Sequence, residues 1–381
     1  MNLKTVTCIG GEGIGVEVVN ATVDLLNFMA IPNLEIVRAR VGIAAEKEHG
    51  KGNYFPESVK ETILNSDAVL FGATHEKTVA VLHYLRFGLD NYAHLRPCKY
   101  YDGLPSPLSN PKGIDILFVR EGMESLYAAL RIGEGRLKKL IDAKILKDIP
   151  QDWKEKSNYS LKIVSEYNST RISEFAVQEA INRKKAGHIG KLTIVHKANV
   201  LPRTDGLFKN IAYKIASPHR EQDGILINDY HVDDMARRII KFPHEQDVLL
   251  CMNEYGDILS DLAAEMVGGI GMIPSGCVGG KVPYFEPIHG AGPDIADPFN
   301  PIANPLGCFL SAKMMLEHIK LYKEAVKLEL AVEEFCRLVE NPSENWRVIP
   351  RDLVPEQFQM EQKHAKTRDV LQKIKEIYEE I

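Results

Sequence analysis

Cysteines are few in this sequence, and none of the six lies in a C-x-x-C pair, the spacing typical of zinc ribbons and thiol redox motifs. Small disulfide-bonded secreted domains carry cysteines far more densely than this chain does. We therefore expect reduced, buried thiols and a cytoplasmic protein. The six are Cys8, Cys98, Cys251, Cys277, Cys308 and Cys336.

Long apolar runs and basic clusters are also missing. No apolar stretch reaches the roughly 18 residues that a membrane-spanning helix needs. The start, MNLKTVTCIGG, has neither the basic beginning nor the apolar stretch of a signal peptide. The net charge is −5 and the pI about 6.2, which argues against a nucleic-acid partner. We therefore expect neither a membrane nor a nucleic acid as a partner.

Hydrophobic residues make up 45% of the sequence, a share that can form a sizeable core. The chain has 381 residues, which is too long for one ordinary core, so we expect two lobes. Apolar strands alternate with amphipathic helices, the pattern of an α/β protein. Strands are predicted at 5–10, 34–41, 67–74, 114–121, 159–167, 191–199, 224–230 and 247–252, and helices at 16–29, 56–65, 78–93 and 258–267.

Three further segments differ from this pattern in their amino-acid composition. The proline-rich passage 96–111 is predicted to be irregular and to lead into the second lobe. The charged segment 134–156 is predicted to be a helical excursion on the surface. From Gly268 to Pro305 the chain is dense in glycine and proline, which predicts loops of the kind that wrap ligands, followed by two long C-terminal helices.

The stretch NEYGDILSD, at 253–261, places two aspartates where a predicted strand gives way to a helix. Asp257 and Asp261 are four residues apart, so both carboxylates project from one helix face and repel by a few tenths of a kcal/mol. One interpretation is an aspartate favoured by the helix dipole beside a solvated one. The other is a divalent cation such as Mg²⁺, which takes carboxylate oxygens as ligands.

The glycine-rich turn GGEGIG, at 10–15, invites a dinucleotide-binding interpretation that fails on inspection. The G-x-G-x-x-G fingerprint needs glycines at offsets 0, 2 and 5, and from Gly11 the last position is Val16. We therefore predict a tight turn between a strand and a helix.

Three arginines, Arg86, Arg96 and Arg120, stand at the ends of predicted elements. Their forked guanidinium groups suit a carboxylate substrate, although a single arginine is more often a surface ion pair. Lys197 ends an apolar strand, where it is either a base or a lysine that reaches into solvent. Tyr127 is a candidate proton donor.

Other polar residues have plain structural explanations. Asp233 and Asp234 begin a predicted helix, and N-capping accounts for one of them. Lone histidines such as His83 are more often structural than ligands of a metal.

Together these segments resemble the β-decarboxylating dehydrogenases, the family of isopropylmalate, isocitrate, homoisocitrate, tartrate and D-malate dehydrogenases. The matches follow the family's order up to about residue 320, through GEGIG, LR…LRP, FVRE…Y, HKANVL, NEYGDILSD and FEPIHGAGPDIA…ANPLGCFLSAKMMLEH. The resemblance implies a two-lobed α/β fold with a large mixed β-sheet, not a Rossmann fold. The larger, cofactor-binding lobe would comprise residues 1–95 and 270–381. The smaller, dimerisation lobe would comprise residues 96–269, with the active site in the cleft between them.

The resemblance also implies oxidation of a 2-hydroxy acid followed by loss of its β-carboxylate as CO₂. Mg²⁺ or Mn²⁺ would be bound by Asp257 and Asp261, with Asp233 contributed by the other subunit of a homodimer. Lys197, also from the partner, would serve as the base, and Tyr127 would protonate C3. Substrate carboxylates would be held by Arg86, Arg96, Arg120 and His83.

The cofactor implied by the resemblance is NAD. Asp294 would accept hydrogen bonds from the adenosine ribose and repel a 2′-phosphate, and it is followed by Ile295, where NADP-using members tend to have a basic residue followed by tyrosine. The complete set of expected cofactor contacts is Thr74, Asn199, Glu286, His289, Gly290, Asp294, Ile295 and Asn304.

Several departures leave the substrate open. The family usually has aspartate at the position of Glu12, and the segment before Arg86 lacks the serine of typical bacterial isocitrate dehydrogenases. Val79 and Leu82 would suit an isopropyl group, whereas His83 would suit a distal carboxylate. We expect 3-isopropylmalate, homoisocitrate or isocitrate. The alternatives are a tartrate- or D-malate-type enzyme and a non-catalytic regulatory subunit of a hetero-oligomer.

Overall fold

The computed structural model describes residues 3–146 and 149–381. Ten strands form one sheet in the order β2-β1-β3-β12-β11-β4-β5-β10-β8-β9. Neighbours are parallel except β12–β11, β11–β4 and β4–β5, so the sheet is mixed, which confirms the predicted fold class. The strands are β1 (Lys4–Gly11), β2 (Leu34–Arg38), β3 (Ala68–Ala73), β4 (Ala93–Lys99), β5 (Asp115–Glu121), β8 (Lys191–His196), β9 (Leu226–His231), β10 (Val248–Cys251), β11 (Pro274–Val278) and β12 (Tyr284–Pro287).

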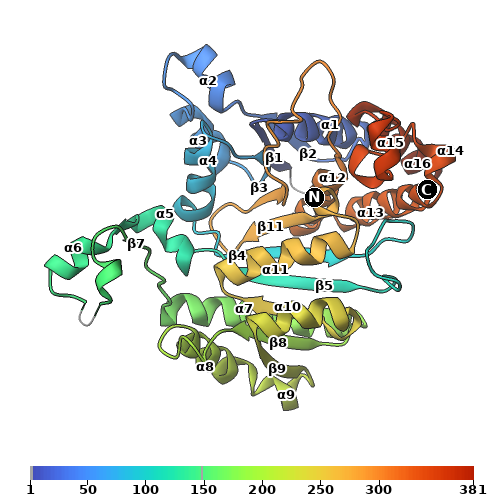
Figure 1. Cartoon of the computed structure of the whole chain (residues 1–381). Coiled ribbons are helices and arrows are strands. Elements are labelled where there is room, and N and C mark those ends of the chain that lie inside the picture. Colours follow the sequence, from blue (N-terminus) through green and yellow to red (C-terminus); the bar gives the residue numbers. More distant parts are fainter. Residues whose placement is uncertain (1–2, 147–148) are drawn as a thin grey trace.

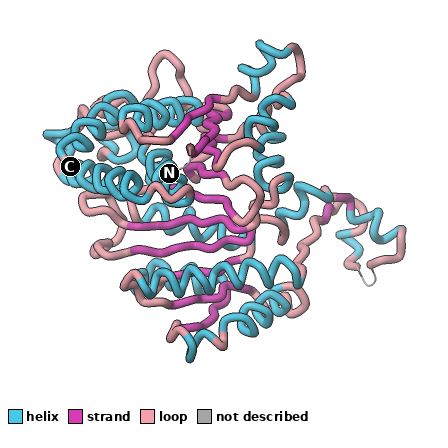
Figure 2. The backbone as a smooth tube through the Cα atoms, turned by 180° about the vertical axis from the view of Figure 1, so that it is seen from behind, coloured by secondary structure: helices cyan, strands magenta, loops and turns pink. Residues whose placement is uncertain are grey.

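Helices pack on both faces of this sheet (Figures 1 and 2). α1 and α12 pack against β1, β3, β11 and β12, whereas α7, α8, α10 and α11 pack against the half from β4 to β9. The helices are α1 (Ile14–Phe28), α2 (Gly42–His49), α3 (Glu57–Leu64), α4 (Val79–His83), α5 (Ala129–Ile132), α6 (Leu137–Asp142), α7 (Glu166–Lys185), α8 (Asp205–Ala216), α9 (His219–Gln222), α10 (Val232–Lys241), α11 (Asn253–Met266), α12 (Leu306–His318), α13 (Tyr322–Arg337), α14 (Pro342–Asn345), α15 (Glu356–Met360) and α16 (Thr367–Glu380).

The glycine turn between β1 and α1 has the structural role that its failed fingerprint predicted. Gly11 and Gly13 have φ of +72° and +58°, a region that side chains disfavour. A Cβ on Gly11 would lie 1.9 Å from the carbonyl oxygen of Ala73, and one on Gly13 would lie 2.0 Å from that of Ala291. The turn therefore lets the backbone of the C-terminal loop approach the start of α1.

The predicted helix at 78–93 is wrong over its second half. α4 ends at His83, a π-helical turn occupies Tyr84–Gly88, and the chain then enters β4. The break is held by Asn91, whose side-chain amide donates to the carbonyls of Leu85 and Val282. Side-chain bonding to distant backbone therefore overrides the helical pattern.

The proline-rich passage was predicted to be irregular, but its first four residues belong to β4. β4 pairs with β11 only over Ala93–Leu95, while it pairs with β5 along its whole length. Pro97, which has no N–H to donate, lies beyond the β11 pairing, so the sheet tolerates it.

The predicted strand at 159–167 is also wrong. Only Tyr159 belongs to a strand, β7 (Asn158–Tyr159), and Ile163 makes a single bridge to Ser125. Ser165 instead caps α7, because its hydroxyl accepts a hydrogen bond of 3.1 Å from the backbone N–H of Asn168. Capping chemistry therefore outweighs the alternating apolar pattern.

The predicted excursion exists but is less helical than expected. α5 and α6, with the small hairpin of β6 (Gly135–Arg136) and β7, project away from the body in Figure 1. Residues 147–148 of the predicted helix lie outside the described residues. The glycine- and proline-rich segment after Gly268 contains two strands that the prediction missed, β11 and β12. Three long helices follow it, α12, α13 and α16, where two were predicted.

The predicted boundaries of the two lobes do not coincide with a break in the sheet. The boundary at residues 95 and 96 falls within β4, which hydrogen-bonds to β11 on one side and to β5 on the other. The division into lobes therefore stays a prediction. All six cysteines are buried and free, as expected. In the described ranges, no helix is long and apolar enough to cross a membrane.

Candidate active site

The end of β5 and the start of α11 bring Arg120, Asp257 and Tyr127 together. The guanidinium of Arg120 pairs with one carboxylate oxygen of Asp257, and the hydroxyl of Tyr127 donates to the other. The Arg120 side chain is fully buried and lies 4.9 Å from the centre of the Tyr127 ring. β5 and α11 pack against each other, so two segments more than 120 residues apart form one charged cluster.

Arg96, on β4, completes this cluster. Its Nη1 lies 3.0 Å from a carboxylate oxygen of Asp257 and 3.3 Å from one of Asp261, and it donates to Ser260 at 2.8 Å. The two aspartates therefore share a cation, which relieves the repulsion expected of their spacing. α11 starts at Asn253, so Asp257 lies in its second turn, outside the first turn where the helix dipole acts most strongly.

The two aspartates differ in their acidity. Burial opposes the charge of Asp257, but the guanidiniums of Arg120 and Arg96 outweigh it and hold its pKa below the usual value. For Asp261 burial dominates and raises the pKa, although Arg96 opposes the shift. Burial and the hydrogen bond to Asp257 raise the pKa of Tyr127, so its hydroxyl keeps its proton and can donate it.

Arg86 and Glu286 extend the charged region toward β12. Arg86 is buried in the π-helical turn. Burial opposes its charge, but the adjacent acidic groups of Tyr284, Cys277 and Glu286 outweigh that effect and raise its pKa. Burial raises the pKa of Glu286 to about 7, although Arg86, Arg96 and Arg120 all favour its charged form. Three guanidiniums therefore act on the same small region, which suits a substrate with more than one carboxylate.

Lys197 and Asp233 form a separate pair. They contact each other, and this ion pair lowers the pKa of the exposed Asp233. In the described part of one chain, neither makes a hydrogen bond or ion pair with Asp257, Asp261 or Tyr127. No group of three His, Cys, Asp or Glu side chains among these residues could hold a metal ion. The predicted ligand set is therefore incomplete within a single chain.

Among the described residues, several buried polar atoms of the cluster and of the predicted cofactor residues have no hydrogen-bond partner. In the cluster and beside it these include Nε of Arg86, Nε of Arg96 and the amide nitrogen of Asn253, and among the predicted cofactor residues they include the hydroxyl of Thr74 and Nε2 of His289. Native proteins rarely leave such atoms unpaired unless a ligand or water satisfies them. Together with the hard oxygen donors of Asp257 and Asp261, these atoms fit a metal, an anionic substrate and a polar cofactor.

The remaining predicted cofactor residues lie in different settings. Gly290, Asp294 and Asn199 are exposed, and Ile295 is half-buried. Asn304 is already engaged, because its amide donates to Asp352 at 3.0 Å and its oxygen accepts from the backbone of Leu306 at 3.0 Å. His83 is exposed, with its ring against Phe87 at 4.8 Å between centres.

Comparison with known proteins decides the family. A family model described as isocitrate/isopropylmalate dehydrogenase matches residues 5–374. This protein belongs to that family. The 3-isopropylmalate/3-methylmalate dehydrogenase of Methanocaldococcus jannaschii is 42% identical over 336 residues, which cover 88% of this chain and 92% of the relative. The isocitrate/homoisocitrate dehydrogenase of Thermus thermophilus is 38% identical, covering 85% and 88%.

A solved structure agrees with this assignment. The crystal structure of isocitrate dehydrogenase from Methylococcus capsulatus superposes with a TM-score of 0.79 at 29% identity and covers 99% of each chain. The chain is therefore a dehydrogenase of the isocitrate/isopropylmalate family, whose members oxidatively decarboxylate hydroxy acids.

Sequence reasoning missed several residues of this dehydrogenase that support the site. Asn253 accepts from Nε and Nη2 of Arg120 at 3.0 and 2.6 Å, and Ser260 holds Arg96. Both lie in NEYGDILSD, so the sequence could have indicated them as supporting residues, because they are hydrogen-bonding side chains close to the two aspartates. Glu12, the departure in the glycine turn, accepts bonds from the backbone of Lys77 and Thr78 at 3.0 Å each and so holds the segment that leads to α4.

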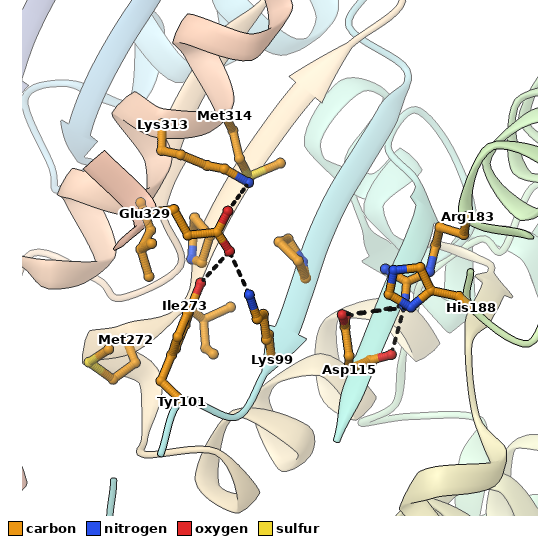
Figure 3. Close-up of a pocket in the computed structure, with 13 residues that line it drawn as sticks. Lys99, Tyr101, Asp115, Arg183, His188, Met272, Ile273, Lys313, Met314 and Glu329 are labelled. Carbon is orange, nitrogen blue, oxygen red and sulfur yellow. Dashed lines mark hydrogen bonds and ion pairs between the residues drawn. The ribbon is translucent and has the colours of Figure 1, made fainter. Parts of the chain in front are cut away.

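A cavity of about 290 Å³ on another part of the dehydrogenase, drawn in Figure 3, is lined by charged side chains that pair with one another. Glu329 accepts from Lys99 at 2.7 Å and Tyr101 at 3.1 Å and pairs with Lys313 at 2.9 Å. Asp115 pairs with Arg183 at 3.1 Å. None of the predicted catalytic residues lines this cavity, so we do not assign the active site to it.

Proposed function

We propose that this chain is an NAD-dependent, Mg²⁺- or Mn²⁺-dependent enzyme that oxidatively decarboxylates a (2R)-malate with a substituent on C3. The substrates we favour are 3-isopropylmalate, homoisocitrate and isocitrate. The observation that carries the proposal is Asp257 held between Arg96, Arg120 and Tyr127. This cluster combines a ligand for a hard cation, a carboxylate clamp and a proton donor.

The arginines hold the substrate in this proposal. Arg96 and Arg120 lie on adjacent strands, and Arg86 lies on the π-helical turn that precedes β4, so their guanidiniums can engage the two malate carboxylates. The substituent on C3 meets the segment at Val79–His83. Val79 and Leu82 favour an apolar group and His83 a distal carboxylate, which leaves the three substrates as candidates.

Two residues move protons. Lys197 takes the proton of the C2 hydroxyl as C2 is oxidised, and Tyr127 gives a proton to C3 once CO₂ has left. Asp257, Asp261 and Asp233 would hold a divalent metal, which would act as a Lewis acid on the substrate, and bound NAD would accept the hydride. Asp294 favours NAD over NADP because a carboxylate repels the 2′-phosphate.

A homodimer with shared active sites would explain why Lys197 and Asp233 do not contact the Asp257 cluster of their own chain. Lys197 and Asp233 pair with each other at the surface, away from the Asp257 cluster, so we propose that they serve the partner subunit's site. Exposed apolar side chains on the two neighbouring helices, Ile240 on α10 and Ile258 on α11, offer a surface for that partner.

The test is a substrate panel with NAD and Mn²⁺. Isopropylmalate, isocitrate, homoisocitrate, D-malate and tartrate are compared by kcat/KM, with NADP and a chelator as controls. Activity on a 3-substituted malate that needs metal and NAD supports the proposal. Activity that survives extensive chelation would refute the metal part of it.

Two other functions have specific tests. In a tartrate- or D-malate-type enzyme, oxidation and decarboxylation can occur separately, so unequal yields of CO₂ and NADH would favour it. A regulatory subunit would be inactive when the chain is purified alone. The presence of Tyr127, Lys197, Asp233, Asp257 and Asp261 favours a catalytic chain.

A further inference from the structure

The turn that carries Tyr127 is held from α11 by Glu254. One oxygen of Glu254 accepts from the hydroxyl of Ser125 at 2.9 Å and from the backbone N–H of Leu126 at 3.1 Å. Ser125 has φ of +67°, an unfavourable conformation for a residue with a side chain, so the turn depends on these bonds. Glu254 therefore controls where the backbone before Tyr127 lies.

The turn that carries Lys197 is held by Asp205, the first residue of α8. One oxygen of this fully buried carboxylate accepts from the backbone N–H of Lys197 at 2.7 Å and from the hydroxyl of Tyr255 at 3.0 Å. Asp205 therefore controls where the backbone of Lys197 lies.

Lys162 joins these two carboxylates. Its ammonium lies 2.8 Å from Glu254 and 2.9 Å from Asp205, and it donates to Tyr255 at 3.1 Å. Only 12% of its side chain is exposed, against 13% for Glu254 and 0% for Asp205. Without this cation two nearly buried carboxylates would keep their hydrogen bonds but lack a counter-charge, which is costly for buried charges.

We propose that Lys162 is a positioning residue that sets the turns of Tyr127 and Lys197 together, through Glu254 and Asp205. The inference rests on the proposed function. If each site combines Tyr127 of one chain with Lys197 of the other, the two turns that one Lys162 holds belong to different active sites of the dimer. Its loss then disturbs both sites, although Lys162 touches neither substrate nor cofactor.

The first test compares Lys162→Met with Lys313→Met. Lys313 is a matched control, because it bridges Glu317 and Glu329 at 3.0 and 2.9 Å with 18% of its side chain exposed, away from the site. We expect Lys162→Met to lower kcat roughly 10–100-fold, since misplacement by about 1 Å costs that much. The KM for NAD should change little, and Lys162→Arg should restore part of kcat. Equal kcat for the two methionine variants would overturn the proposal.

The second test uses mixed dimers. Tyr127→Phe and Lys197→Ala chains, mixed in equal amounts, should recover about a quarter of wild-type activity, because about half the dimers hold one intact site. In two further mixtures, a Lys162→Met chain takes the place of the Tyr127→Phe chain or of the Lys197→Ala chain. The activity of each of these mixtures should stay well below a quarter of the wild-type value. Recovery to about a quarter with one of the two partners would mean that Lys162 positions only one turn, which contradicts the proposal.

Failure of the proposed function has a different signature. If Tyr127→Phe and Lys197→Ala chains exchange subunits and do not complement each other, the shared site is wrong, and the link between two active sites falls with it. The kcat comparison with Lys313→Met still decides whether Lys162 positions the two turns within one chain.

Discussion

The cluster around Asp257 and the pair Lys197–Asp233 carry chemistry of the same kind in opposite settings. Arg120 is fully buried, and Asp257 is in contact with two guanidiniums and a phenol from its own chain. The side chains of Lys197 and Asp233 are 26% and 65% exposed, and each has the other as its ion-pair partner. The first group has its counter-charges within one chain, whereas we propose that the second serves the site of a partner subunit.

This contrast teaches how the site is divided. A buried cation such as Arg120 is costly unless a counter-charge lies beside it, and here Asp257 of the same chain supplies that charge. An exposed ion pair contributes little to stability, because water screens it. In the dimer that we propose, Lys197 and Asp233 could therefore separate at little cost and contact a partner subunit and a metal.

The largest expected effect is that of Asp257→Asn. The change keeps the shape and removes a ligand charge, so it should lower metal affinity and cut kcat roughly 100-fold or more, since even residues behind the ligands cost 10–100-fold. Metal titrations and steady-state kinetics measure both. Asp102→Asn, at the exposed pair with Lys112, is the control and should retain activity. Wild-type-like kinetics for Asp257→Asn would remove the cluster from the mechanism.

Mixed dimers test the division of the site most directly. Lys197→Ala and Asp257→Asn should each be nearly inactive alone, and their equal mixture should reach about a quarter of wild-type activity. One heterodimer site collects both defects and the other collects neither. Subunit exchange is verified by mass spectrometry of differently tagged chains. No recovery despite exchange would place all catalytic groups within one chain.

Cofactor choice has a smaller expected effect. Asp294→Ala removes the carboxylate that would repel a 2′-phosphate, so the preference for NAD over NADP, measured as a ratio of kcat/KM values, should fall about tenfold or more. Asp297→Ala, in the same loop, is the matched control, since its carboxylate accepts from the backbone of Phe299. Equal use of both cofactors by the wild type would contradict the role of Asp294.

The smallest effect concerns stability and pH. Burial raises the pKa of Glu286 from 4.5 to about 7, so the folded state holds this proton more tightly than the unfolded state does. The contribution of Glu286 to the free energy of unfolding therefore declines as pH rises from about 4.5 to about 7. Glu286→Gln should remove that decline in denaturant titrations, whereas Asp233→Asn, at the exposed pair, should keep it. Identical profiles for Glu286→Gln and wild type would show that Glu286 titrates normally.

Much of the fold was predictable because local patterns and tertiary packing agree. The predicted strand at 67–74 is apolar from Ala68 to Ala73, and these residues form the fully buried strand β3. The helix predicted after residue 257 keeps Asp257 and Asp261 on one face. The errors arise where a side chain bonds across the fold. Asn91 ends the helix at 78–93, and Ser165 turns a predicted strand into the start of α7.

By itself the sequence determined the family, the mixed α/β class and most of the charged groups of the site, because these follow from residue identity and spacing along the chain. Only the tertiary structure decided which of those groups meet. The pairing of Asp257 with Arg96 and Arg120, the support from Asn253 and Ser260, and the bridge through Lys162 join residues 43 to 164 positions apart. Contacts of that range depend on how β4, β5 and α11 pack, and no local pattern encodes that packing.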